Sequence, residues 1–499
     1  MSSTKNKLTI NATSSMIQVA FTAILYFFLY KYLLNTLGVQ QLGVWSLILS
    51  FSSIANLANL GLTSGLVKFV ADYLAEKKEE KIGKLILTSF ISLALLFSII
   101  SLIILFGAKY FLHLVIDEQF LELAYSILPL SLGSLCINAL SGVFTSVLEG
   151  YQKNYIRNFI YILSGMVMYI GTILLTPFFQ LKGVAIAQFL QAIFVLVFSL
   201  VLMIQINPFN RIRYWKWSKK SFFELFGYGL KFQAVSICQL LYEPTTKLLL
   251  SKYGGLALLG HYELANRLVN QFRSLLVSAN QVVIPVIAQT VKIKSQEYRI
   301  DFYSKMNRIM LLFTFPLSTL LILLTPMISF LWIGSLSDHF IYSVYILTIG
   351  YIVNIMSGPS FFSCMGEGRL NIPLLSHLIM ALVNIALGCL FGYFWGGYGI
   401  IMAWGIALII GSLVTIIFYQ KRIQLSFGNI FTFNDWEIIV ISLFLIVGSI
   451  ILFTLDIIWL NNMMKTIFIL VLSIILYGVV LRKNDIIKTA KDFILKKKV

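Results

Sequence analysis

The stretch GVQQLGVW (Gly38–Trp45) is repeated in altered form as GLALLGHY (Gly255–Tyr262), 217 positions later. Two further pairs follow in the same order, at offsets of 218 and 216: LEGYQ (148–152) with GEGRL (366–370), and GVAIA (183–187) with GIIMA (399–403). Each match alone is weak. Three matches in order at nearly one offset indicate an internal repeat.

The composition places the repeat in a membrane. Of 499 residues, 59% are hydrophobic and only 12% are charged, whereas soluble domains carry about 25% charged residues. Apolar runs of about 20 residues, the length that crosses a bilayer as a helix, recur throughout. An all-α polytopic protein with fourteen spans is predicted, at 10–34, 42–66, 85–107, 121–148, 155–179, 183–206, 223–251, 256–288, 305–333, 340–364, 371–394, 397–419, 436–456 and 463–481.

The repeat unit then holds six spans, an even number, so its two copies enter the membrane in the same orientation. The predicted parts are an N-lobe (1–210), a basic linker (211–222), a C-lobe (223–422), and two added spans with a basic tail (423–499). Parallel repeats of this kind are known from secondary transporters, which bind substrate between the copies. The alternative is a duplication that only built a stable bundle.

The formal net charge of +18 follows the predicted topology. Among the 38 Lys and Arg residues, only Lys109, Lys182, Lys252 and Lys465 fall in or beside the loops opposite the termini, and five lie inside spans and away from the loops. The rest lie on the side of the termini, so the positive-inside rule places both termini in the cytoplasm. We interpret the basic surplus as a topology signal and a contact for anionic lipids, and we expect no nucleic-acid partner.

Motifs for enzymatic or metal chemistry are missing from the sequence. It has no GxxxxGK[ST] nucleotide-binding motif, no metal-ligand spacing of His, Asp or Glu, and no CxxC pair among its four cysteines. We therefore expect no cofactor and no metal. Any energy source would be an H⁺ or Na⁺ gradient, the membrane potential or mass action.

The chain resembles the polysaccharide-transporter branch of the multidrug/oligosaccharidyl-lipid/polysaccharide exporter superfamily, in particular bacterial O-antigen flippases. The residues that carry the resemblance are LGVQQLGVWSLILSFSSIANLANLGLTSGLVKFVADY (37–73), LEGYQKNY (148–155) and WIG…FFSCMGEGRLNIP (332–373). The resemblance implies a V-shaped pair of six-helix lobes with two C-terminal helices. It also implies that an undecaprenyl-diphosphate-linked oligosaccharide moves from the cytoplasmic to the outer leaflet.

A diphosphate crosses hydrocarbon only where fixed positive charge and water accompany it. Ionisable residues inside spans are functional candidates by default. Arg267 is the foremost candidate because it lies about 16 Å from the outer end of its span. Glu263, Arg267 and Asn270 follow helical spacing as one polar stripe, which maps through the repeat onto Ser46, Ser50 and Ser53. The alternative is an ion pair that only joins span 8 to a neighbour.

Further basic candidates lie nearer the membrane surfaces. Lys31 and Lys247 are 216 positions apart, so they occupy equivalent outer positions, where a cavity role and snorkelling to headgroups compete. The same competition applies to Arg273 and Lys231 on the cytoplasmic side. Glu243 could neutralise Lys247 or serve as a protonatable coupling group, and the adjacent Pro244 predicts a hinge.

Glu149 and Glu367 end equivalent spans at the cytoplasmic face, where a carboxylate meets an unfavourable helix dipole. Each is expected to have a basic partner, and a cytoplasmic gate with Lys153, Arg157 or Arg369 is one interpretation. A glycine C-cap with a salt bridge is the other.

The leading hypothesis is a flippase for a lipid-linked oligosaccharide, such as an O-antigen or other repeat unit, which works by alternating access in the bacterial inner membrane. Other expected partners are membrane lipids, a polysaccharide polymerase and a chain-length regulator. A drug or cation antiporter of the same superfamily is the nearest alternative, but bases outnumber acids within the spans. An integral membrane glycosyltransferase or polymerase is disfavoured, because no large outer loop is predicted.

Overall fold

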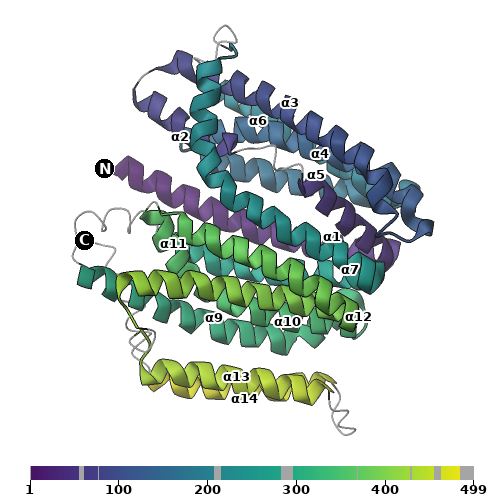
Figure 1. The fold of residues 1–499 in the computed structure, drawn as a ribbon, viewed down its shortest axis with the longest axis vertical. Helices are drawn as coiled ribbons and strands as arrows, with labels where there is room; N and C mark the ends of the chain where they lie inside the picture. Colours follow the sequence, from purple (N-terminus) through teal and green to yellow (C-terminus); the bar gives the residue numbers. More distant parts are fainter. Residues whose placement is uncertain are drawn as a thin grey trace. The chain divides into compact units, whose positions relative to one another are not determined.

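The computed structural model describes residues 2–54, 61–76, 78–206, 215–281, 296–367, 369–426, 430–454 and 462–483. Within these ranges the chain is almost entirely α-helical and contains no strand (Figure 1). This agrees with the all-α architecture predicted from the apolar runs.

The helices are numbered as in Figure 1. They are α1 (Ser2–Ile54), α2 (Leu62–Ala75), α3 (Glu79–Leu112), α4 (Glu118–Gly150), α5 (Asn154–Phe179), α6 (Leu181–Ile206), α7 (Lys219–Gln281), α9 (Gln296–Ile333), α10 (Asp338–Met356), α11 (Gly358–Gly366), α12 (Asn371–Ile423), α13 (Phe433–Thr454) and α14 (Asn462–Lys483).

Three of these helices are interrupted by a single glycine outside the helical region. Gly38 breaks α1 at φ 78° and ψ 169°, Gly255 breaks α7 at φ 75° and ψ 168°, and Gly396 breaks α12 at φ 61° and ψ −147°. Such backbone conformations are essentially restricted to glycine, because a Cβ would clash with the neighbouring peptide groups. Each break separates two of the predicted spans, so each of these long helices consists of two segments that meet at the glycine.

Nine helices in the described ranges are long and apolar enough to cross a membrane. When α1, α7 and α12 are divided at their glycines, the helical segments follow the predicted spans in order within the described residues, and the span predicted at 340–364 is divided between α10 and α11. The number of membrane crossings stays a prediction. Large apolar side chains such as Phe106, Phe178 and Phe444 are well exposed along the helices, as lipid-facing side chains would be.

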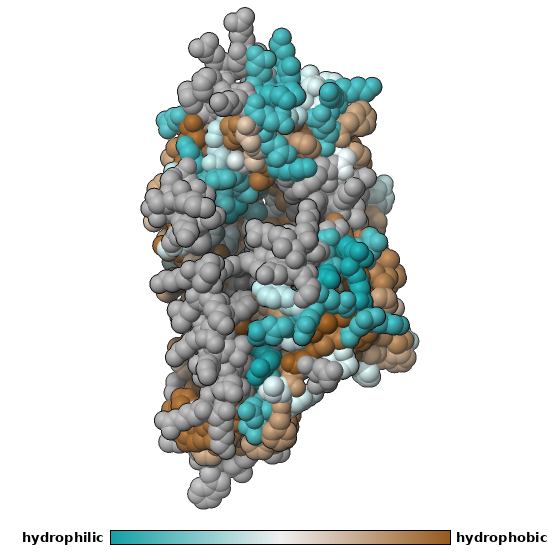
Figure 2. All heavy atoms as spheres, turned by 90° about the vertical axis from the view of Figure 1, so that its left-hand side faces the viewer, coloured by the Kyte–Doolittle hydropathy of each residue, from teal (hydrophilic) through white to brown (hydrophobic). Residues whose placement is uncertain are grey.

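Hydrophilic side chains are numerous on the side of the molecule at which α1 begins. Figure 2 views the molecule from the side at which α1 begins, and teal hydrophilic side chains are concentrated on this face while brown apolar side chains flank it. This separation is the one expected where apolar flanks lie in lipid and the ends lie in water.

The chain divides into two compact units, Met1–Gly260 and His261–Val499. In the first unit, α4 packs on α6 and α3, and α5 packs on α6 and α1. In the second unit, α10 packs on α12 and α9. The predicted linker at 211–222 lies inside the first unit, and its residues up to 214 are outside the described part. The division falls later because α7 residues before Gly260 bond within the first unit: Glu224 accepts from Tyr73 of α2, and Ser251 donates to the Val115 carbonyl.

The two C-terminal helices belong to the second unit and pack on α9. Asp435, at the start of α13, is fully buried and accepts from the Arg308 Nε of α9 at 2.7 Å and from the Thr432 backbone at 2.8 Å. Deeper in the bundle, the Tyr477 hydroxyl of α14 bonds Ser442 of α13 at 2.7 Å and donates to Thr319 of α9 at 3.1 Å. Polar contacts at two depths thus join the added helices to α9.

Candidate functional site

A polar stripe runs along the second segment of α7. The Arg267 Nε donates to the Glu263 Oε1 at 2.9 Å, one helical turn apart. The Glu263 side chain is 3% exposed and the Arg267 side chain is 33% exposed. The carboxylate is therefore buried, whereas part of the arginine side chain is accessible. The predicted pair therefore forms, and it is net neutral.

The stripe continues through Asn266 and Asn270, joined by an amide bond of 2.7 Å. Tyr351 of α10 donates its hydroxyl to the Asn270 Oδ1 at 3.1 Å. The second segment of α7 is thereby joined to α10 within the second unit. Asn270, a predicted stripe residue, is a hydrogen-bonded link in this network.

Arg273 is held by the same two helices. Its Nε donates to the Asn354 Oδ1 at 2.8 Å, and its guanidinium carbon lies 5.6 Å from the centre of the Tyr351 ring. Asn354 donates in turn to Ser412 of α12 at 3.1 Å. Through these contacts the Arg273 side chain lies against α10, within the helix bundle. They do not show it extended toward lipid headgroups.

The two arginines differ in their electrostatic surroundings. Arg267 is paired with a carboxylate, whereas Arg273 donates to an amide and lies against an aromatic ring. An ion pair largely cancels its own field, but a guanidinium with neutral partners keeps a full positive charge. In this network Arg273 is accordingly the stronger attractor for an anion.

Lys247 and Glu243 form the second predicted pair, with the Lys247 Nζ 3.3 Å from the Glu243 Oε1. The Lys247 side chain is 5% exposed and that of Glu243 is 57% exposed, so the base is the buried partner. Pro244 is buried inside α7, yet the helical dihedrals continue through it, and the break in α7 lies at Gly255. A hinge at Pro244 stays a prediction.

The remaining predicted residues of the first unit are less informative. Lys31 is half-buried on α1. Lys231 lies in α7, but its side chain is outside the described part. Ser46 and Ser50 are buried, and the hydroxyls of Ser50 and Ser53 donate to carbonyls of their own helix at 2.9 and 2.7 Å. A cavity shared by these residues stays a prediction.

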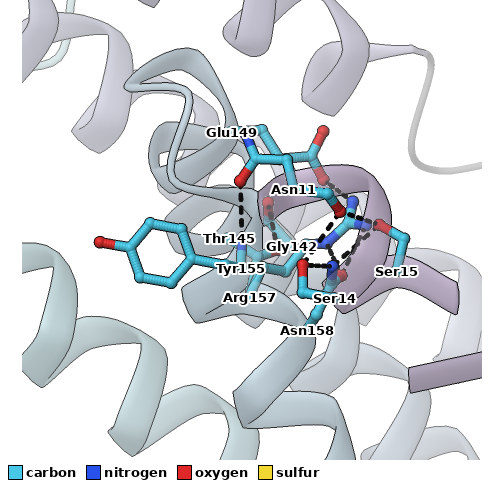
Figure 3. A network of polar contacts seen from close by, with 9 residues as sticks. All are labelled: Asn11, Ser14, Ser15, Gly142, Thr145, Glu149, Tyr155, Arg157 and Asn158. Carbon is cyan, nitrogen blue, oxygen red and sulfur yellow. Dashed lines mark hydrogen bonds and ion pairs between the residues drawn. The ribbon is translucent and has the colours of Figure 1, made fainter. Parts of the chain in front are cut away.

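Glu149, at the end of α4, forms its ion pair with Arg157 of α5, one of the predicted partners (Figure 3). Arg157 also donates to Asn158, whose amide donates to Ser14 and Ser15 of α1, each at 2.9 Å. Asn11 of α1 closes the network, because its Oδ1 accepts from the Tyr155 backbone at 3.2 Å. The network joins α1, α4 and α5 of the first unit.

The equivalent Glu367 pairs with Arg422, at the end of α12, at 2.8 Å. The expected basic partner of Glu367 is present, but it is Arg422 and none of Lys153, Arg157 and Arg369, which the gate interpretation named. Arg369 is exposed and follows Glu367 by only two positions, whereas α12 brings Arg422 onto the buried carboxylate. Tyr419 adds a hydrogen bond to Glu367 at 3.1 Å. Each glutamate is thus bridged within its own unit, and a gate remains a hypothesis.

In the first unit, a hydrogen bond joins Tyr73, near the end of α2, to Glu224, near the start of α7. The Tyr73 hydroxyl donates to the Glu224 carboxylate at 3.1 Å, linking α2 to the start of α7. Burial of Tyr73 and its hydrogen bond to Glu224 raise the pKa of Tyr73 to about 12. The neutral phenol is therefore the form that the fold stabilises.

Several network residues escaped the sequence analysis, notably Tyr351, Asn354 and Ser412, and in the other unit Asn11 and Asn158. The available signal was an asparagine inside an otherwise apolar run. That signal does not say which neighbour the amide bonds, because the partners lie 58 to 144 positions away.

Solved structures with the same fold are membrane transporters. The lipid II flippase MurJ, in an inward closed conformation, superposes with a TM-score of 0.72 at 18% identity, over 93% of this chain and 97% of that chain. An inward-facing multidrug resistance MATE transporter of the MOP superfamily gives 0.65 at 14% identity, over 82% and 98%. A MOP superfamily transporter from Pyrococcus furiosus gives 0.55 at 14% identity, over 84% and 94%.

No curated protein matches the chain at a significant level. The model of the family described as "Polysaccharide biosynthesis protein" matches residues 8–291, more than half of the chain. The protein therefore belongs to the polysaccharide biosynthesis protein family and is a multi-pass membrane protein with the fold of the MOP-superfamily flippases and transporters.

Proposed function

We propose that the protein is a flippase that moves an undecaprenyl-diphosphate-linked oligosaccharide, such as an O-antigen or other surface-polysaccharide repeat unit. Transport runs from the cytoplasmic to the outer leaflet of the bacterial cytoplasmic membrane by alternating access, with both termini cytoplasmic. Two findings support the proposal: the family is named for polysaccharide biosynthesis, and a lipid II flippase shares the fold over nearly the whole chain.

The observation that carries the proposal is the state of Arg273. It lies half-buried in an apolar helix bundle, and its described contacts are neutral. A guanidinium presents several donors in a planar fork that matches phosphate oxygens. A diphosphate that approaches the stripe would meet a guanidinium whose described partners are an amide and an aromatic ring, and Asn354 would hold the guanidinium in place.

Arg267 supplies a second cation to the same site in this proposal. Because a third of its side chain is exposed, it can contact a ligand without leaving Glu263. Because Glu263 cancels much of the positive charge of Arg267, the pair attracts an anion less strongly than Arg273 does. The main role of Arg267 would be to orient the bound diphosphate. Lys247 and Lys31 would receive the diphosphate nearer the outer surface.

The direct test is a flipping assay in proteoliposomes with an undecaprenyl-diphosphate oligosaccharide that carries a fluorophore quenched by an impermeant reductant. The native protein should expose the protected half of the fluorophore faster than protein-free vesicles do. Arg273→Gln should lower the initial rate at least tenfold. Lys305→Gln removes an exposed charge that is paired with Asp301 at 2.6 Å, and it should leave the rate unchanged. A native rate equal to that of empty vesicles would overturn the proposal.

A drug or cation antiporter is the second candidate, because MATE transporters share the fold. Such a pump needs an acidic group available for a substrate cation. Glu243 and Glu263 are instead each paired with a base one turn away. Transport of a cationic dye against a proton gradient, with no flipping of the lipid-linked sugar, would favour the antiporter.

A further inference from the structure

The two copies of the repeated glycine motif contact each other. Gly43 lies one turn after the break at Gly38, and Gly260 lies one turn after the break at Gly255. The two breaks have nearly the same φ and ψ. All of these residues belong to the first unit, so their contacts are internal to it.

The contact is reciprocal. A Cβ added at Gly43 would lie 2.1 Å from the Leu256 carbonyl oxygen, and a Cβ added at Gly260 would lie 2.2 Å from the Val39 carbonyl oxygen. The repeat offset of 217 carries Gly43 onto Gly260 and Val39 onto Leu256. Each copy therefore presents its glycine to the same carbonyl of the other, as in a contact across a two-fold axis.

At Gly43 and Gly260 a larger residue would clash with backbone atoms of the facing helix. Ordinary carbon contacts need about 3.5 Å or more, so a methyl group at either glycine would force the helices apart by more than about 1 Å. A helix carbonyl has no rotamer to escape into, unlike a flexible side chain. The glycines also bring Cα–H groups against carbonyl oxygens, a weak attraction that recurs where helices cross closely.

We infer that this crossing of Gly43 with Leu256 and of Gly260 with Val39 is the outer closure of the transport pathway, and that it separates when the protein opens outward. The inference rests on the proposed function, because it requires alternating access and cytoplasmic termini. Under that topology both glycine breaks are outer turns, and the contact lies just below them. Ser50, two turns further along α1, is 3% exposed and lies on the inner side of the closure.

The experiment uses the full-length protein with its four cysteines replaced and Ser50→Cys introduced, in right-side-out vesicles treated with an impermeant maleimide. With both glycines intact, the introduced thiol should label slowly from outside. Gly43→Ala or Gly260→Ala should accelerate labelling at least tenfold. Because both substitutions break one crossing, the double variant should label little faster than either single variant. Gly448→Ala, which has open space around it, is the matched control and should change nothing.

Fast labelling with both glycines intact, or unchanged labelling in both alanine variants, would overturn the inference. If neither alanine variant folds, the glycine-intact protein is followed over hours. Accumulating label would support a closure that opens, and complete protection in vesicles that flip substrate would refute it. Labelling needs no cargo, so a normal labelling response without flipping would overturn only the proposed function.

Discussion

Arg267→Ala tests whether the arginine of the α7 stripe binds cargo or only balances Glu263. The substitution removes the ion-pair partner of a carboxylate whose side chain is 3% exposed. Breaking a buried ion pair from one side costs 3–5 kcal/mol, because a charge is left in a poorly polarisable site. Arg267 itself is one-third exposed, so water offsets part of this, and we expect a loss of about 3 kcal/mol.

The double variant Glu263→Gln with Arg267→Ala removes the stranded charge. Its stability should return to within about 1–3 kcal/mol of the native protein, since a neutral amide left without a partner costs less to bury than a carboxylate. If Arg267 contacts the diphosphate, flipping should stay at least tenfold below the native rate even though the fold is restored. Stability is followed by denaturant unfolding in detergent, and transport by the quenching assay, on the same preparations.

Two results would refute this reasoning. Native stability of Arg267→Ala would show that Glu263 does not depend on this ion pair. Native flipping by the double variant would show that Arg267 serves only as a counter-charge, and Arg273 would then be left as the cation for cargo. Glu263→Gln alone should retain most of the stability, because Arg267 can extend toward water through its exposed third.

The other predictions concern contacts within single units. Asp435→Ala should lower the free energy of unfolding by about 3 kcal/mol or more, because Arg308 loses a fully buried partner, and proteolysis should release α13 and α14 more readily. The Tyr73 pKa lies above the unfolded value of 10, so its contribution is complete below pH 10 and is lost as the pH rises toward 12. Tyr73→Phe should make this alkaline loss smaller than in the native protein, measured as unfolding midpoints from pH 8 to 12. Gly255→Ala should cost about 1–3 kcal/mol through backbone strain alone, measured by thermal unfolding.

Each of these has a matched control. Asp301→Ala breaks an exposed ion pair with Lys305 and should cost less than 1 kcal/mol, so an equal loss in Asp435→Ala would contradict the burial argument. An alkaline loss as large in Tyr73→Phe as in the native protein would contradict the role assigned to Tyr73. For Gly255→Ala the control is Gly478→Ala, a helical glycine with open space around it, which should be neutral or slightly stabilising.

Local spacing explains why part of the site could be predicted. Glu263 with Arg267 and Glu243 with Lys247 are each four positions apart, and helical geometry alone brings such side chains together. The pair of Glu149 with Arg157 was also reachable, since a tight turn separates them. The choice of Arg422 over Arg369 was not, because it depends on how α12 returns to the end of α11.

The sequence by itself determined the helical membrane class and the order of the helical segments, because these depend on apolar run length and on residues a few positions apart, and it predicted the internal repeat. Only the tertiary structure decided that Arg273 turns to Asn354 and Tyr351, and that Asp435 fastens α13 to Arg308. It also decided that the repeated glycines meet at one crossing. Such contacts depend on which helix faces which neighbour, and in an almost uniformly apolar chain many faces are equally able to pack. Specific polar partners and close glycine contacts select among them, and their pairing is visible only once the helices are in place.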